Sequence, residues 1–187
     1  MKRLFKISGT LTLSALAMMI VAVIAVNIKP KDMDNRVEEL KEYCRTNGYN
    51  TEYGILVDYG RLSAQKRFFV YDFKQDKIVI NTFAGHGNGG KSTLLKADFS
   101  NVSGSHCSSL GHYRIGKERK MYTRNCKAFE LDGLDATNSN VRSRAILIHP
   151  SSYPLSWGCV TLSFTKYQTL AKLLRTQPEN VIMWVYK

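Results

Sequence analysis

Several residue patterns that identify common protein classes are missing from this sequence. The four cysteines do not have zinc-ligand spacing, and a chain of 187 residues is too large to need a disulfide scaffold. There is no glycine-rich phosphate loop, no basic and aromatic RNA-binding signature and no internal repeat. Acidic residues are also scarce, because 15 Asp and Glu face 27 Lys and Arg, a net charge of +12. This excess favours a polyanionic partner, and the missing signatures argue for no nucleic acid, which leaves anionic lipid or acidic envelope polymers.

The first 28 residues contain an uncharged stretch that indicates export. Lys2, Arg3 and Lys6 precede residues 7–28, where no side chain is charged. A bilayer needs about 20 apolar residues, so this segment is long enough to span one as an N-terminal hydrophobic helix. It is either a signal peptide or a membrane anchor, and the weak cleavage site at residues 23–25 favours the anchor. The rest of the chain would then lie in the periplasm or at the outer face of the cytoplasmic membrane.

Residues 29–50 predict a linker and a short helix. Asp34 can cap its start, Val37, Leu40 and Cys44 share one apolar face, and Gly48 suits its end. We expect this helix to pack on the domain that follows, with Cys44 in the core.

Residues 51–187 predict a single catalytic domain of the mainly β class with flanking helices. The segments rich in β-branched and aromatic residues predict strands, and the first three predict an antiparallel meander. Expected strands cover residues 54–59, 67–73, 78–83, 110–115, 127–131, 144–149 and 181–186. Ser163 can cap a helix with an apolar face of Phe164, Tyr167, Ala171 and Leu174. Residues 84–108 form a long loop, a length that is typical of functional segments.

A histidine and a cysteine are brought near each other by the stretch from residue 145 to 162. An apolar strand delivers His149, and Cys159 follows ten residues later after a loop rich in Ser, Pro and Gly. A neighbouring imidazole makes a thiol a strong nucleophile by taking its proton. Gly158 allows a sharp turn that can aim backbone amides at an oxyanion. The alternative is a buried structural cysteine and a strand-end histidine, but neither needs this loop context.

These residues resemble a known catalytic signature. Residues 148–150, Ile-His-Pro, followed by residues 156–159, Ser-Trp-Gly-Cys, are similar to the Ile-His-Gly and Ser-His-Gly-Cys motifs of the L,D-transpeptidase catalytic-domain family. Residues 108–115 resemble the Thr-Pro-x-Gly-x-Phe-x-Ile segment of the same family. Trp157 departs from the pattern, because most members have a second histidine there. The resemblance implies an L,D-transpeptidase-like twisted β-sandwich that uses no metal and no organic cofactor.

The resemblance also implies a reaction and its residues. Cys159 would attack a peptidoglycan stem peptide to form a thioester, with His149 as the base and the Pro150 carbonyl orienting its ring. Backbone amides near Gly158 would bind the oxyanion. The candidate substrate contacts are Ser156, Trp157, Tyr153, His106 and Ser108.

Three other functions remain open at this point. Water in place of an acceptor amine would make the enzyme an L,D-carboxypeptidase. A non-catalytic cell-wall-binding module would use Trp157 and Tyr153 to stack on sugar. A sortase-like enzyme is disfavoured, because it expects Thr-Leu-x-Thr-Cys and a nearby catalytic arginine, whereas the next arginine here is Arg175.

The remaining reactive residues give weaker expectations. His86 and His106 are expected as exposed loop histidines unless they line the site. Cys107 and Cys126 flank one hairpin and are the candidate disulfide pair, although two reduced thiols fit equally well. The basic connection across residues 117–124 is expected to be a solvated hairpin tip, with a surface for anionic substrate as the alternative.

Overall fold

The computed structural model of this chain describes residues 30–121, 125–177 and 180–187. Asp32–Lys187 forms one compact unit, which includes the helix expected after the linker. The expected hydrophobic helix at residues 7–28 lies outside the described residues. Among the residues that are described, no helix is both long and apolar enough to cross a membrane.

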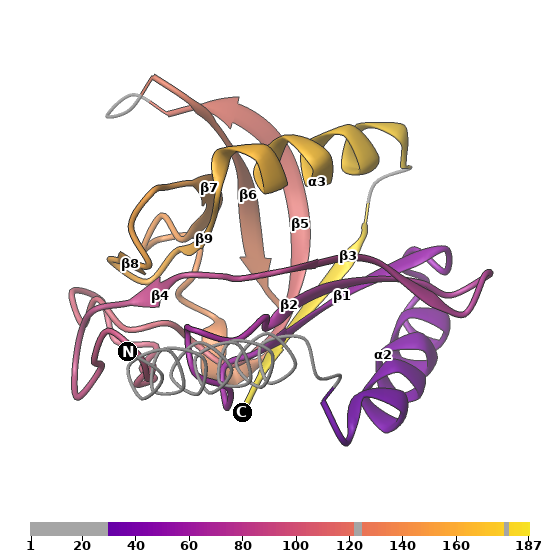
Figure 1. The fold of residues 1–187 in the computed structure, drawn as a ribbon, viewed down its shortest axis with the longest axis horizontal. Coiled ribbons are helices and arrows are strands. Elements are labelled where there is room, and N and C mark those ends of the chain that lie inside the picture. The colour runs from indigo at the N-terminus through magenta and orange to yellow at the C-terminus, as the bar shows by residue number, and fades with distance from the viewer. Residues whose placement is uncertain (1–29, 122–124, 178–179) are drawn as a thin grey trace, which may run out of the picture. The chain divides into compact units, whose positions relative to one another are not determined.

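The described residues are mainly β, with ten strands and two α-helices, which confirms the expected class. Eight strands form one sheet in the order β3-β2-β1-β10-β5-β6-β7-β9, and β4 pairs with β8 in a small second sheet (Figure 1). The strands are β1 (Tyr53–Asp58), β2 (Phe68–Asp72), β3 (Lys77–Thr82), β4 (His86–Gly87), β5 (Gly111–Lys120), β6 (Lys127–Gly133), β7 (Leu147–Pro150), β8 (Leu155–Ser156), β9 (Val160–Leu162) and β10 (Ile182–Tyr186). The helices are α2 (Met33–Thr46) and α3 (Phe164–Thr176), and a 3₁₀ turn η1 covers Ala136–Asn138.

The sheet contains the expected antiparallel meander, and its centre holds the last strand of the chain, a position that the sequence did not predict. β1, β2 and β3 pair antiparallel in sequence order, as the strand patterns predicted. The last strand, β10, lies between β1 and β5, parallel to the first and antiparallel to the second. Its side chains Ile182, Val185 and Tyr186 are buried, which suits a strand covered on both faces. β10 therefore joins the meander to the half of the sheet that carries the histidine and cysteine.

Two cores lie on the two faces of this sheet. The larger core takes side chains from β1 and β2 together with β7, β9 and α3, so the two halves of the sheet face each other across it. The second core packs α2 against β1, β2 and β10. Residues Val37, Leu40 and Cys44 are buried there, as their spacing predicted.

The ends of both helices follow local signals, with two corrections. The N-cap of α2 is Asp32 rather than Asp34, because the helix begins two residues earlier in the linker, while Gly48 follows its end with φ of +70° as expected. The Ser163 hydroxyl caps α3 by accepting the Lys166 amide hydrogen at 3.4 Å. Phe164 is 58% exposed, so its expected core position is wrong. It occupies the first helical position, whereas Tyr167, Leu170, Ala171 and Leu174 form the buried face.

The expected disulfide is absent. All four cysteines lie within the described ranges and are thiols. Cys107 precedes β5 and Cys126 follows its far end, so the ten residues of β5 separate them. An antiparallel strand of that length spans about 30 Å, far beyond the reach of a disulfide. The two cysteines flank the same hairpin strand, but they lie at its opposite ends and cannot pair.

Candidate active site

The histidine and the cysteine come from neighbouring strands. β7 and β9 pair in parallel, with His149 opposite Thr161 and Ile148 opposite Val160. Cys159 directly precedes β9, at the level where β7 begins. The strand expected at residues 144–149 begins only at Leu147, because Ala145 has φ of +53° and the chain turns there. The two candidate catalytic residues thus lie two positions apart along one edge of the sheet.

His149 is held by its own strand end. The residue is 4% exposed, and its Nδ1 lies 3.0 Å from the Pro150 carbonyl oxygen. This is the orienting contact that the sequence predicted. A carbonyl can only accept, so the contact places the proton on Nδ1 and leaves the Nε2 lone pair able to take another.

The sulfur of Cys159 lies against the start of β7. The Leu147 amide N–H donates to Sγ at 3.4 Å, and the Ala145 carbonyl oxygen is 3.9 Å from the same atom. A donor pointing at sulfur favours the thiolate over the thiol. The residue is partly exposed, so a substrate carbonyl can reach it.

The turn before the nucleophile depends on Gly158 and Ser156. Gly158 has φ of +110°, and a methyl group there would lie 2.7 Å from both the Cys107 carbonyl oxygen and Cδ1 of Ile146. The Ser156 hydroxyl donates to the Cys159 carbonyl at 2.7 Å and accepts the Gly158 amide hydrogen at 3.2 Å. Ser156 therefore shapes the turn. The Gly158 amide, which the sequence predicted would bind the oxyanion, already donates to the Ser156 hydroxyl.

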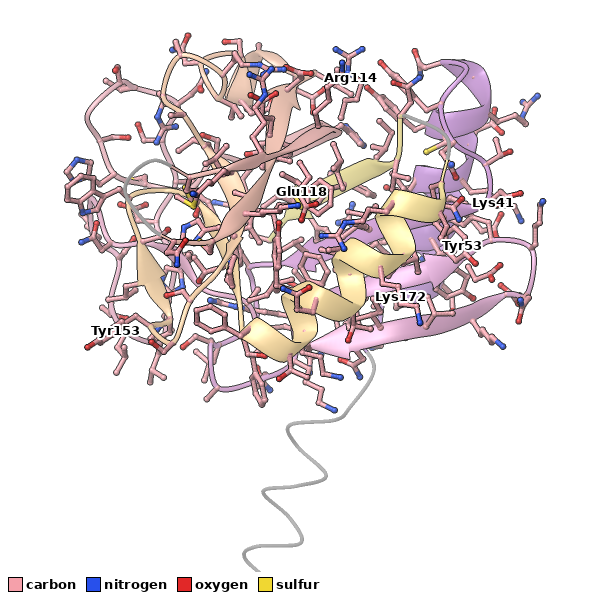
Figure 2. All side chains as sticks on the ribbon, turned by 90° about the horizontal axis from the view of Figure 1, so that it is seen from above. Lys41, Tyr53, Arg114, Glu118, Tyr153 and Lys172 are labelled. Atoms are coloured by element: carbon pink, nitrogen blue, oxygen red, sulfur yellow. The ribbon has the colours of Figure 1, made fainter. Side chains whose placement is uncertain are left out.

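Trp157 and Tyr153 project outward around this turn, with exposed fractions of 71% and 76%. Figure 2 shows Tyr153 pointing away from the domain at the edge of the molecule. The ring of His106 stacks on Trp157, so two predicted substrate contacts from distant segments meet. Of the two exposed rings, that of Trp157 belongs to the residue two positions before the nucleophile.

Ser108 lies behind the turn rather than on its surface. It is 2% exposed, accepts the Gly87 amide hydrogen at 2.9 Å and donates to the Gly158 carbonyl at 3.4 Å. Both bonds tie backbone segments together. Its burial supports a positioning role in place of the expected substrate contact.

His86 is fully buried, so the expectation of an exposed loop histidine is wrong for it. Arg67 Nη2 lies 2.6 Å from its Nδ1, and its Nε2 lies 3.0 Å from the Thr93 carbonyl and 3.1 Å from the Lys96 carbonyl. Burial and the neighbouring Arg67 cation both lower the pKa of His86. The neutral ring accepts from Arg67 and donates from Nε2, which anchors residues 93–96 to β4.

Arg144 is a site residue that the sequence did not reveal. Its guanidinium donates to the carbonyls of Ser100 and Cys107 at 2.9 and 2.6 Å, and to Ser109 Oγ at 2.8 Å. The Cys107 carbonyl that it holds is also the atom packed against Gly158. Arg144 therefore fixes the loop before β5 against the nucleophile turn. The sequence indicated only that it begins the strand expected at residues 144–149, whereas it lies before β7.

Across the ranges that the structure describes, His, Cys, Asp and Glu form no group of three able to hold a metal ion. The groups that the described residues offer at this site are a thiol, an imidazole and backbone amides. These groups are suited to acyl transfer.

Solved structures similar to this chain include several L,D-transpeptidases. One from Xylanimonas cellulosilytica is 15% identical with a TM-score of 0.44, and the match covers 78% of this chain and 68% of that one. One from Mycobacterium smegmatis is 10% identical with a TM-score of 0.43, covering 73% of this chain and 59% of that one. A helical cell shape determining protein from Campylobacter jejuni is 16% identical with a TM-score of 0.46, and this chain covers 47% of it while 72% of this chain is matched.

A search of curated proteins found no match. A family model described as the L,D-transpeptidase catalytic domain matches residues 25–186, which include both signature motifs and every strand described above. A match over most of the sequence establishes membership, and this chain belongs to the L,D-transpeptidase catalytic-domain family.

Proposed function

We propose that this protein is a cysteine L,D-transpeptidase that crosslinks peptidoglycan stem peptides through a thioester on Cys159. The observation that carries the proposal is the arrangement of β7. Its Leu147 amide donates to the sulfur, while the histidine two residues later has Nδ1 beside the Pro150 carbonyl, which favours the tautomer whose Nε2 is basic. Family membership supports the substrate class.

In the first half-reaction, His149 Nε2 takes the thiol proton and the thiolate attacks the carbonyl of an L,D peptide bond. A tetrahedral oxyanion forms and collapses, the C–N bond breaks, and His149 returns the proton to the leaving D-amino acid. Backbone amides of the turn at Gly158 and Cys159 stabilise the oxyanion. Binding there displaces the Ser156 hydroxyl from the Gly158 amide.

In the second half-reaction, an amine of another stem peptide attacks the thioester carbonyl. His149 takes the proton of the amine, the new amide forms, and the thiolate of Cys159 leaves. Water as the acceptor gives L,D-carboxypeptidase activity from the same intermediate. The exposed rings of Trp157 and Tyr153 provide contacts for the two peptides.

Intact-mass analysis after incubation with a donor tetrapeptide tests this function. The wild type gains the mass of the tripeptide acyl group, and Cys159→Ala does not. His149→Ala slows acylation by about 10²- to 10⁴-fold, the usual value of base assistance. A carbapenem that reacts with thiols serves as a second acylating agent.

The control must separate an enzyme from a wall-binding module, which the exposed Trp157 and Tyr153 would also suit. Cys126→Ala is the matched control, because this thiol lies at the tip of the hairpin and should leave acylation unchanged. Binding of the wild type to purified sacculi without acylation would favour the module. If His149→Ala is acylated at the wild-type rate, His149 is not the base.

We also propose that residues 7–28 anchor the domain at the outer face of the cytoplasmic membrane or in the periplasm. The uncharged stretch and its basic flank motivate this placement. The full-length chain should stay in the membrane fraction after a high-salt wash. A soluble mature form beginning near residue 26 would instead show that the segment is a cleaved signal peptide.

A further inference from the structure

A second surface with the character of a binding site lies between the β5–β6 hairpin and α3. Two adjoining grooves there have volumes of about 490 and 450 Å³, and Glu118 and Arg175 line both. Figure 2 shows Glu118 and Arg114 along this side of the hairpin, with α3 beside them. We name the two together the hairpin groove. It reaches Pro150 at one end but is not lined by His149 or Cys159.

The hairpin groove carries excess positive charge. Seven basic and three acidic side chains line it. The acids are already paired, since Glu118 binds Arg175 at 2.8 Å, and Glu130 and Asp132 both bind arginines.

Three lysines supply most of the positive charge that those ion pairs leave uncompensated. Lys117, Lys120 and Lys127 are exposed, and none of them forms an ion pair with any residue that the structure describes. Uncompensated charge in a concave surface concentrates anions more strongly than the same charge on a flat one. An anionic ligand in the groove would meet these lysines without breaking an existing ion pair.

The groove also offers an aromatic face. Phe164 lines it and is 58% exposed, although it stands at the start of a helix whose other large apolar residues are mostly buried. An exposed aromatic ring beside cations suits a sugar ring that carries negative groups, because the ring face packs on CH groups while the charges pair. A bilayer surface is too flat to enter a groove of this kind.

We propose that the hairpin groove binds a strand of an anionic glycan, with carboxylate groups on Lys117, Lys120 and Lys127 and a sugar ring on Phe164. The inference deepens the proposed function, because it gives the enzyme a second contact with the wall beside its reaction site. Binding at the groove needs neither Cys159 nor His149.

Titration of the full-length chain in detergent with polygalacturonate oligosaccharides tests the proposal. The triple variant Lys117→Gln, Lys120→Gln, Lys127→Gln should weaken binding at least about tenfold, and added salt should weaken the wild type in the same direction. The control Lys77→Gln, Lys91→Gln, Lys96→Gln removes the same charge from exposed sites elsewhere and should stay within about twofold. Equal losses of affinity in the two triple variants would show that the hairpin groove is not the binding site.

Phe164→Ala and two further anions separate a glycan from other partners. Phe164→Ala should weaken polygalacturonate about threefold or more and leave inorganic polyphosphate unchanged. Neutral dextran should not bind. Polyphosphate or phosphatidylglycerol vesicles that bind as tightly as the glycan, with no effect of Phe164→Ala, would overturn the glycan assignment.

The two proposals fail separately. Acylation of Cys159 by a short donor peptide should be unchanged in the lysine triple variant, since that peptide does not reach the groove. If the wild type binds polygalacturonate but is not acylated, the transpeptidase proposal is rejected and the glycan-binding proposal stands. If the wild type is acylated normally but does not bind the glycan, the glycan-binding proposal is rejected and the transpeptidase proposal stands.

Discussion

The imidazole of His106 lies flat on the indole of Trp157, with ring centroids 5.0 Å apart and planes within 8°. His106 has φ of +54°, a conformation that costs a residue other than glycine roughly 1 kcal/mol or more. Trp157 is 71% exposed, so little else restrains it. The stack therefore orients an exposed indole two residues before the nucleophile.

Substitution of Trp157 should separate its shape from its chemistry. The indole has one N–H donor and no base, so it cannot exchange a proton as the family's usual histidine could. Trp157→Phe should keep most of the acylation rate, because it still stacks on His106. Trp157→Ala should lose roughly tenfold, and His106→Ala a similar amount, with the double variant no worse than either single one. If Trp157→Phe is as inactive as Cys159→Ala, the indole N–H takes part directly.

Gly158→Ala should damage both stability and activity. A methyl group there meets the Cys107 carbonyl oxygen and Ile146 at 2.7 Å in a backbone conformation that alanine rarely adopts. We expect a loss of more than about 2 kcal/mol in the free energy of unfolding, from strain and overlap together. Gly48→Ala is the control, since Gly48 also has positive φ but has open space around it. That change should cost only about 1 kcal/mol in urea unfolding and leave acylation intact. Equal costs would show that overlap at Gly158 is relieved.

Local patterns in the sequence predicted the elements whose boundaries depend on neighbouring residues. The apolar face of α2, the Ser163 cap of α3 and the β1–β3 meander follow from periodicity and turn chemistry. The contact from His149 to the Pro150 carbonyl could also be predicted, because its two partners are adjacent in the chain.

Contacts between distant segments could not be predicted in this way. Nothing local shows that β10 is central, since a strand rich in apolar residues fits several places in a sheet. His86 stands in a polar loop, and its burial follows from Arg67, which is 19 residues away. The guanidinium of Arg67 is itself fully buried and donates to the Ala84 carbonyl. Burying a charged side chain is costly, and the hydrogen bonds to a segment distant in sequence offset that cost.

The buried His86 should make stability depend on pH. Burial and then Arg67 lower its pKa in the fold, so the unfolded chain binds the extra proton first. Its contribution to stability is therefore complete above the unfolded value of about 6.5 and is lost as the pH falls below it. Urea unfolding between pH 7.5 and 5 should show this loss, and His86→Gln should flatten that part of the curve. His106→Gln, at a histidine outside this buried network, is the control and should keep the wild-type slope.

Arg144 should act by position rather than by charge. Its guanidinium reaches two carbonyls and the Ser109 hydroxyl at once, a fan of contacts that a lysine cannot reproduce. Arg144→Lys and Arg144→Ala should both lower kcat for acylation by about tenfold to 100-fold, because a displacement of about 1 Å at the sulfur is enough. Far-UV circular dichroism should stay near that of the wild type, since the residue lies outside the regular strands.

Accessibility of Cys107 distinguishes this role from electrostatic help to the thiolate. Cys107 is 3% exposed, its pKa is raised by burial, and its carbonyl is one of the two to which Arg144 donates. A loosened loop should therefore let a thiol reagent modify Cys107 in both variants, measured by mass spectrometry in a Cys159→Ala background. If Arg144 served only as a positive charge, Arg144→Lys would restore the acylation rate and its pH profile and leave Cys107 protected. Arg144→Lys therefore gives opposite results under the two roles: slow acylation with an accessible Cys107 if Arg144 acts by position, and normal acylation with a protected Cys107 if it acts by charge. This one substitution separates the two roles at the turn that carries Cys159.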